Sequence, residues 1–268
     1  MFVSDYDGTI ADSNGIVSEE TILQLKRVGE LGVTRVIATG RSFYSFKRTV
    51  GNSFPIDYLI CSSGAGVYDW KTMKILQKNK ITEEDTKEIY NYLIKNNYDF
   101  MVQLPLPDNH FFHHFYSGMQ KNQDFFDRIK NYEESGLKHV LKCPKEASQF
   151  VIIVPQENGQ FNDIHSKFSG MKVLRATSPI DGRSFWIEIL PNGISKVSGI
   201  DFISKKRNIN IENIVVVGND YYDLDMLKHA NAQNAYVVAN APNELKSTFN
   251  VIGININEGV SELLKEIY

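Results

Sequence analysis

Two aspartates near the start of the chain, Asp5 and Asp7, are spaced i, i+2 at the end of the strand-like run 2–5. Residues two apart on a strand face the same side, and Gly8 lets the chain turn so that the second carboxylate reaches whatever the first one holds. Two converging acids repel each other and bind protons unless a cation or an electrophile lies between them. The pair indicates a magnesium-dependent phosphoryl-transfer site in which Asp5 attacks phosphorus and Asp7 transfers protons. An ordinary turn is the alternative, because Asp-Gly is a common turn pair.

A hydroxyl and backbone N–H groups follow the apolar run 34–38, at Thr39, Gly40 and Arg41. Ligands of open α/β sheets gather beyond the carboxyl ends of the strands, and a helix start at that edge accepts an anion. Taken alone, Thr39 is equally well explained as a helix N-cap, and Arg41 either reaches a substrate or pairs with a neighbouring carboxylate. Lys196 stands in the first turn of a later helix, where the macrodipole disfavours a cation unless an anion lies beside it.

An acidic loop, 218–225, follows the apolar run 214–217. Magnesium takes oxygen ligands in octahedral geometry, usually from few protein groups together with water and phosphate. Asn219, Asp220 and Asp223 are therefore candidate metal ligands, although acidic loops without a partner also occur on protein surfaces.

These segments meet only if a parallel sheet brings their strand ends together. Short apolar runs alternate with helical patterns at both ends of the chain, which predicts an α/β fold with a Rossmann-like parallel-sheet core formed by residues 1–80 and 190–268. The expected strands of this core are 2–5, 34–38, 58–61, 214–217 and 236–238, and its expected helices are 19–31 and 224–230.

Residues 81–189 have a different pattern and are predicted to form an inserted α+β cap domain. Its expected helices are 83–95 and 119–134, and its expected strands are 100–104, 150–154, 172–176 and 185–189. The segment 110–116 is rich in aromatic and histidine side chains, which either pack in the cap or stack on a sugar ring. His113 and His114 are adjacent, so on a strand they point to opposite faces and are poor joint metal ligands.

Composition excludes several classes of protein. The chain has 268 residues, 42% of them hydrophobic, and a formal net charge of -3, which predicts a folded protein that binds neither nucleic acid nor an anionic membrane. Small phosphorylated metabolites fit better as partners. Cys61 and Cys143 form no disulfide framework or zinc motif. The absence of a leader and of an apolar run of membrane-spanning length predicts a soluble, cytoplasmic protein. No pattern indicates an oligomeric state.

Four segments together resemble the haloacid dehalogenase superfamily of phosphatases, in the Cof-like branch with a large α/β cap. They read Asp5-Tyr-Asp7-Gly-Thr9, Ile37-Ala-Thr39-Gly-Arg41, Gly193-Ile-Ser-Lys196 and Gly218-Asn-Asp-Tyr-Tyr-Asp223. The resemblance covers nearly the whole chain, and the segment 240–246 is also similar to this branch.

The resemblance implies a role for each matching residue. Asp5 forms an aspartyl-phosphate, while Asp7 protonates the leaving oxygen and then deprotonates the attacking water. Thr39 and Lys196 hold the phosphoryl oxygens as charge builds up. The other phosphate-binding candidates are Gly40, Arg41 and Asn240. Magnesium lies on the Asp5 carboxylate, the Asp7 backbone carbonyl and the loop with Asn219, Asp220 and Asp223.

Two segments depart from the family pattern. The usual fourth motif reads G-D-x-x-N-D, so Asn219 replaces the first acid and Tyr222 replaces the later asparagine, while Asp223 keeps its place. The segment 62–65 reads Ser-Ser-Gly-Ala where the family usually has Asn-Gly-Ala. The inner metal shell therefore has one negative charge fewer unless Asp220 moves in.

Three functions remain open at this point. The leading one is a magnesium-dependent phosphatase that hydrolyses a small phosphorylated metabolite, in particular a sugar phosphate. A phosphomutase on the same fold would return the phosphoryl group to sugar, and a non-catalytic sensor of sugar phosphates would need only the pocket. The presence of both Asp5 and Asp7 argues against the sensor, because a binding protein needs neither a nucleophile nor a general acid.

Overall fold

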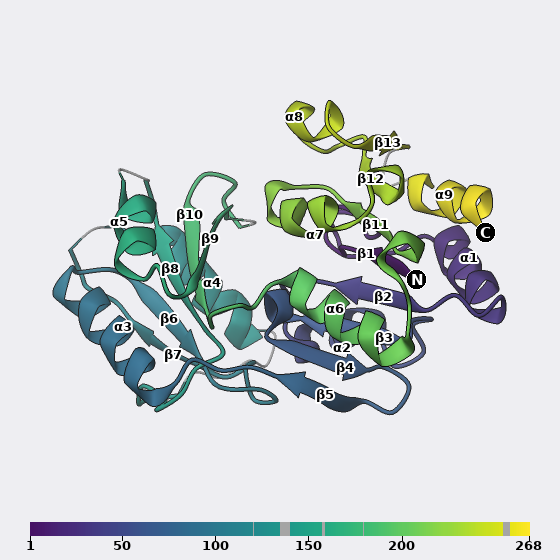
Figure 1. Cartoon of the computed structure of the whole chain (residues 1–268). Helices are drawn as coiled ribbons and strands as arrows, with labels where there is room; N and C mark the ends of the chain where they lie inside the picture. Colours follow the sequence, from purple (N-terminus) through teal and green to yellow (C-terminus); the bar gives the residue numbers. More distant parts are fainter. Residues whose placement is uncertain (120, 135–139, 157–158, 179, 254–257) are drawn as a thin grey trace. The chain divides into compact units, whose positions relative to one another are not determined.

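The computed structural model describes residues 1–119, 121–134, 140–156, 159–178, 180–253 and 258–268. The chain divides into two compact units (Figure 1). The first unit is formed by Met1–Gln77 and Ser195–Tyr268, and the second by Lys78–Ile194. In the described ranges, every helix is too short or too polar to cross a membrane.

The first unit is built on an eight-stranded sheet in the order β13-β12-β11-β1-β2-β3-β4-β5. β1 lies inside the sheet, parallel to β11 on one side and to β2 on the other. The strands are β1 (Phe2–Ser4), β2 (Arg35–Ala38), β3 (Tyr58–Cys61), β4 (Gly66–Asp69), β5 (Lys74–Lys78), β11 (Val215–Gly218), β12 (Ala235–Val238) and β13 (Asn250–Ile252). The predicted parallel-sheet core is confirmed, and β4 runs antiparallel to its neighbour β3.

Helices cover both faces of this sheet because its strands are apolar on both sides. The helices are α1 (Glu19–Glu30), α2 (Phe43–Val50), α6 (Lys196–Arg207), α7 (Leu224–His229), α8 (Asn243–Lys246) and α9 (Gly259–Ile267). Val3, Val36 and Val216 pack in one core cluster with residues of α6 and α7. Figure 1 shows α1 and α9 side by side, in agreement with their contacts.

The helix after β2 begins later than its sequence suggests. Ser42 is the N-cap of α2 and accepts a hydrogen bond from the Ser45 backbone N–H. Thr39 is therefore not an N-cap, because three residues of turn separate it from the helix. The interpretation of Thr39 as a helix cap is wrong, and its buried hydroxyl needs another explanation.

The second unit contains a five-stranded sheet in the order β7-β6-β8-β10-β9, whose assigned pairs are antiparallel. Its elements are α3 (Glu83–Lys95), β6 (Phe100–Gln103), β7 (Phe112–Phe115), α4 (Gln123–Glu134), β8 (Gln149–Val154), α5 (Gln160–Lys167), β9 (Lys172–Thr177) and β10 (Phe185–Leu190). The expected helix 119–134 begins only at Gln123, since Asn122 accepts a hydrogen bond from the Phe125 N–H. Residue 120 of that segment lies outside the described residues.

The aromatic and histidine segment includes one core residue. Phe112 is only 1% exposed and packs with Phe125 in a core cluster, so of the two alternatives for this segment Phe112 fits packing in the cap and not stacking on a sugar. His113 lies 3.2 Å from the Tyr90 hydroxyl, whereas His114 packs against the Phe125 ring. The two imidazoles face opposite sides of β7, as predicted.

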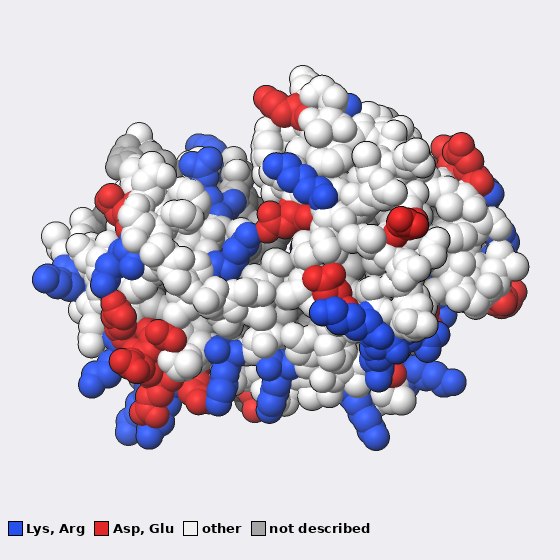
Figure 2. All heavy atoms as spheres, in the orientation of Figure 1, with Lys and Arg blue, Asp and Glu red and all other residues white. Residues whose placement is uncertain are grey.

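Charged side chains of both signs are interspersed on the surface (Figure 2). Acidic side chains gather around α3, whose first turn contains Glu83, Glu84 and Asp85. Acids at the start of a helix interact favourably with its macrodipole. This patch therefore stabilises α3.

Candidate active site

Asp5 follows β1 directly and lies at the carboxyl edge of the first sheet. Its backbone N–H donates to the Val217 carbonyl at 2.9 Å, which continues the pairing with β11 by one residue. The side chain is buried, and its Oδ2 accepts a hydrogen bond from the Thr9 hydroxyl at 3.1 Å. Gly8 has φ 75°, a conformation that favours glycine and turns the chain so that Thr9 comes back to Asp5.

Lys196 places its ammonium between two carboxylates. Its Nζ lies 2.5 Å from Asp5 Oδ1 and 2.7 Å from Asp223 Oδ1, and all three side chains are buried. The position of Lys196 at the start of α6 disfavours a cation, and the two anions offset this cost. The sheet thus brings together three of the residues predicted from the sequence.

The charges of this cluster do not balance. Burial and the charge of Asp223 raise the pKa of Asp5, Lys196 lowers it, and the net result is a pKa of about 7. Burial disfavours the charged form of Lys196, but Asp223 and Asp5 together raise its pKa above the usual value. With two buried carboxylates and one ammonium, the cluster favours an additional proton or cation.

Asp7 points away from this cluster and pairs with Arg41. The guanidinium donates to both carboxylate oxygens, with Nη2 2.6 Å from Oδ1 and Nε 2.9 Å from Oδ2. Arg41 also lies over the Tyr6 ring at 5.1 Å. Of the two alternatives for Arg41, the structure contains the carboxylate pair. Asp7 itself is exposed, so its carboxylate is accessible to a reacting group and to water.

Thr39 and Gly40 form the turn after β2. The Thr39 hydroxyl accepts a hydrogen bond from the Arg41 N–H at 3.1 Å, which explains why the buried side chain is polar. The Thr39 carbonyl accepts from the Ser63 N–H at 3.0 Å. A Cβ at Gly40 would lie 3.7 Å from Ser63 Oγ, so this turn packs directly against the segment after β3.

The acidic loop packs against the turn at Gly8. A Cβ at Gly8 would lie 2.5 Å from Asn219 Nδ2, so the amide of Asn219 contacts the backbone next to Asp7. Asn240 donates from Nδ2 to the Gly8 carbonyl at 2.9 Å. Both residues are therefore beside the first motif, but Asn240 uses its amide to hold the turn.

Asp220 and Asp223 make different contacts in this loop. Asp223 Oδ2 accepts from the backbone N–H groups of Asn219 and Asp220 at 2.9 and 3.2 Å, in addition to the Lys196 bond on Oδ1. Asp220 Oδ1 accepts from the Tyr221 N–H at 2.6 Å. Burial raises the pKa of Asp220, and the nearby Asp223 adds to this effect.

The donor oxygens near Asp5 fit a magnesium ion. The carboxylate of Asp5 carries excess negative charge, and the Asn219 amide lies beside the same turn. Within the described ranges, no three His, Cys, Asp or Glu side chains converge on a possible metal position. Magnesium usually takes one or two protein carboxylates and completes its shell with water and substrate phosphate.

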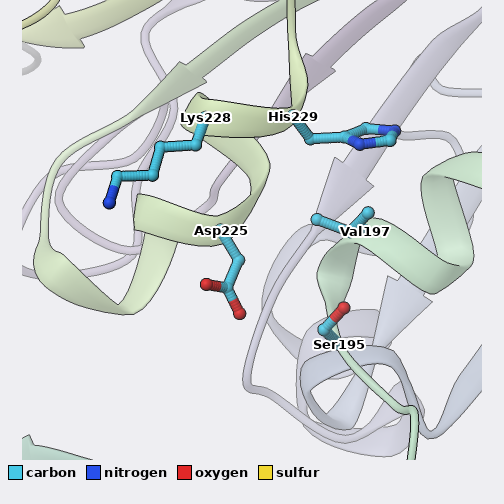
Figure 3. A pocket seen from close by; sticks show the side chains of 5 residues that line it. All are labelled: Ser195, Val197, Asp225, Lys228 and His229. Atoms are coloured by element: carbon cyan, nitrogen blue, oxygen red, sulfur yellow. The ribbon is translucent and has the colours of Figure 1, made fainter.

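A separate hollow of about 400 Å³ lies between α6 and α7 (Figure 3). It is lined by Ser195, Val197, Asp225, Lys228 and His229. His229 pairs with Asp201 at 2.9 Å on α6. None of the predicted site residues lines this hollow, so it is distinct from the cluster around Asp5.

Sequence reasoning left three contacting residues without a role: Thr9, Ser63 and Tyr222. Thr9 is bonded to Asp5, and Ser63 to Tyr222. The last two stand where the sequence departs from the family pattern, and that departure is the signal that identifies them. Because Ser63 and Tyr222 are in contact, substitutions at the two positions are expected to have coupled effects.

The sequence and the fold agree on the class of protein. The sequence profile of the haloacid dehalogenase-like hydrolases matches residues 2–264. The chain belongs to this family, and the predicted enzyme class, a hydrolase of the phosphatase type, is confirmed.

Particular relatives span nearly the whole chain. The 5-amino-6-(5-phospho-D-ribitylamino)uracil phosphatase of Bacillus subtilis is 21% identical over 270 residues, which cover 99% of this chain and 94% of the relative. A phosphatase of the HAD enzyme superfamily from Bacteroides thetaiotaomicron has a similar structure, with TM-score 0.80, 20% identity and coverage of 99% and 93%. A HAD subclass IIB sugar phosphatase matches with TM-score 0.77, 18% identity and coverage of 99% and 97%.

Proposed function

We propose that this protein is a magnesium-dependent phosphatase that hydrolyses a small phosphorylated metabolite, in particular a sugar phosphate, through an aspartyl-phosphate on Asp5. The observation that carries the proposal is the buried Asp5 carboxylate, bonded to the Lys196 ammonium, with the exposed Asp7 two residues further on. A nucleophile and an acid-base group so arranged suit covalent phosphoryl transfer.

In the first step, an Asp5 oxygen forms a bond to phosphorus and the bond from phosphorus to the leaving oxygen breaks. Asp7 gives its proton to that oxygen. In the second step, water attacks the phosphorus of the acyl phosphate and Asp7 takes up the proton of the water, so Asp5 and inorganic phosphate are released. Arg41 orients Asp7 for both proton transfers through its two-oxygen contact.

Lys196 contacts a different group before and during the reaction. It neutralises Asp5 in the resting enzyme, and it binds a phosphoryl oxygen as negative charge develops there. Thr39, Gly40 and the neighbouring N–H groups bind the other phosphoryl oxygens.

Magnesium, when bound, neutralises phosphoryl charge. We assign it to Asp5, the Asp7 carbonyl and Asn219, with Asp220 nearby. Asp223 anchors the loop and Lys196 rather than the ion, because it accepts two backbone N–H groups of the loop in addition to the Lys196 ammonium, whereas Asp5 accepts one hydroxyl besides that ammonium.

The substrate class is proposed from chemistry and from relatives. The names of the similar proteins refer to a sugar phosphatase and to a phosphatase for a phosphorylated ribityl compound. Both names describe phosphate on a small polyhydroxylated carbon chain. A phosphomutase remains the alternative, since the same aspartyl-phosphate can be returned to a sugar hydroxyl.

The test is phosphate release from p-nitrophenyl phosphate with magnesium and with excess chelator, followed by a panel of sugar phosphates ranked by kcat/KM. We expect turnover that depends on magnesium and is lost in Asp5→Asn. Acid quench during turnover should trap a hydroxylamine-sensitive acyl phosphate. Absence of phosphate release from all substrates would overturn the proposal, and isomerised hexose phosphate from a hexose bisphosphate would favour the mutase.

A further inference from the structure

Ser63 and Tyr222 meet through their hydroxyl groups. Ser63 Oγ and Tyr222 Oη lie 2.6 Å apart, and Ser63 is 2% exposed. Ser63 lies in the segment after the third strand that departs from the family pattern, and Tyr222 is, with Asn219, one of the two departures in the acidic loop. The hydrogen bond therefore joins one changed residue of each segment.

The turn Ser62–Gly64 fixes Ser63 between two other motifs. Its N–H donates to the Thr39 carbonyl, and a side chain at Gly64 would collide with the backbone of Ser195, the residue before Lys196. Ser62 and Ser63 have φ values of 47° and 55°. Positive φ is unfavourable for serine and persists only where the surroundings impose it. The hydroxyl of Ser63 is thus held at a fixed position beside the site.

The ring of Tyr222 lies over the Lys196 ammonium. Nζ is 5.6 Å from the ring centroid, within the range of a cation–π interaction. A Cβ at Gly40 would lie 3.9 Å from the ring atom Cε1, so the ring also borders the turn that follows Thr39. Tyr222 therefore lies beside the Lys196 ammonium and beside the turn at Gly40, the two places proposed to bind the phosphoryl oxygens.

We propose that Tyr222, anchored by the Ser63 hydroxyl, is a positioning residue for Lys196. The ring holds the ammonium in the direction of Gly40, and the hydrogen bond prevents the ring from turning away. This inference rests on the proposed function, because the value of a positioned ammonium lies in its contact with a phosphoryl group.

The experiment compares Tyr222→Phe, Ser63→Ala and their double variant with the wild type. The matched control is Tyr221→Phe, because the neighbouring tyrosine is exposed and donates its hydroxyl to Glu244 at 2.9 Å, away from Lys196. Two quantities are measured: kcat and KM for p-nitrophenyl phosphate, and the Kd of inorganic phosphate by calorimetry with magnesium present. The second quantity reports on the pocket whether or not turnover occurs.

We expect each single variant to lower kcat and to weaken phosphate binding by roughly 3- to 10-fold, the value of one neutral hydrogen bond. The double variant should be no worse than either single one, because both remove the same bond. Tyr222→Leu, which also removes the ring, should lose more, and Tyr221→Phe should match the wild type.

Losses that simply add in the double variant, or an unchanged phosphate Kd in Tyr222→Phe, would overturn the inference. So would a fall in melting temperature with unchanged kcat and Kd, since that is the result of a purely structural contact. If the wild type releases no phosphate from any ester, the proposed function fails, while the phosphate Kd values of the five variants still decide the role of Tyr222.

Discussion

The carboxylates of Asp5 and Asp223, from opposite ends of the chain, are bonded to the same ammonium group. Their surroundings differ in one respect. Asp223 also accepts two backbone N–H groups, whereas the other oxygen of Asp5 accepts one hydroxyl. Asp223 therefore has more hydrogen-bond donors around its carboxylate than Asp5 has. Replacing each acid by its neutral amide should change the stability of the protein by different amounts.

Asp5→Asn should abolish turnover without lowering the free energy of unfolding. The amide cannot form an acyl phosphate, and its neutrality leaves the buried Lys196–Asp223 pair balanced. Asp223→Asn should instead destabilise the protein by about 1–3 kcal/mol, because the amide presents a donor to groups that themselves donate. Chemical denaturation of both variants checks this, and equal destabilisation would contradict the asymmetry.

The metal-free enzyme should lose stability as pH rises through the range set by Asp5. The pKa of Asp5 is about 7 in the folded protein against the ordinary 3.8, so between about pH 4 and pH 7 the folded state binds the extra proton and the unfolded state does not. The contribution is fully present below pH 4 and is lost by about pH 7.

The measurement is the unfolding free energy of wild type minus that of Asp5→Asn in chelator, because other titrating groups cancel in this difference. This difference in unfolding free energy should fall between about pH 4 and pH 7. Magnesium should flatten the fall, because a bound cation lowers the pKa of its ligand. A difference that stays constant between about pH 4 and pH 7 would show that Asp5 is ionised throughout this range and would contradict the prediction.

Asp7→Asn should slow the reaction by roughly 10²- to 10⁴-fold through loss of acid-base catalysis. Single-turnover formation of the acyl phosphate should suffer less with an aryl phosphate, whose leaving group needs little protonation, than with an alkyl phosphate. Arg41→Met should reproduce this selectivity in weaker form and change stability by less than about 1 kcal/mol, because the ion pair is partly exposed. Equal losses with both leaving groups would argue against Asp7 as general acid.

Asn219→Asp should lower the magnesium concentration needed for half-saturation by roughly 3- to 10-fold, since it adds a charge beside the Asp5 turn. Calorimetric titration of magnesium measures this without turnover. Asp220→Asn is the comparison, because Asp220 accepts the Tyr221 N–H and caps its own loop. A larger effect at Asp220 than at Asn219 would place the ion one residue further along.

The sequence predicted the strands that end at the site, because apolar runs followed by Asp5, Thr39 and Gly218 are local signals. It also predicted the helix that begins at Lys196. It did not predict β4 and β5, whose segment 66–78 contains charged and turn residues. The start of α2 was missed because Thr39 and Ser42 are both good N-caps, and only the tertiary contact of Thr39 with Ser63 decides between them.

The contacts within the site depend on distances that no local pattern contains. The Lys196 bond to two acids and the Arg41 bond to Asp7 require the sheet order to be known. The sequence left the role of Phe112 open for a related reason, since an aromatic side chain suits a ligand and a domain core equally well and only its burial distinguishes them.

The place of β1 inside the sheet determines when the enzyme acquires its chemistry during synthesis. The strand that presents Asp5 is made before Lys78–Ile194, whereas its parallel neighbour β11 and the ammonium of Lys196 are made only after it. The inserted unit is continuous in sequence and is expected to fold before the first unit, because Met1–Gln77 lacks its partner segment Ser195–Tyr268 until that segment is made. The nascent chain therefore contains Asp5 long before Lys196 and Asp223, and the three-residue cluster is expected to form only after Asp223 has emerged.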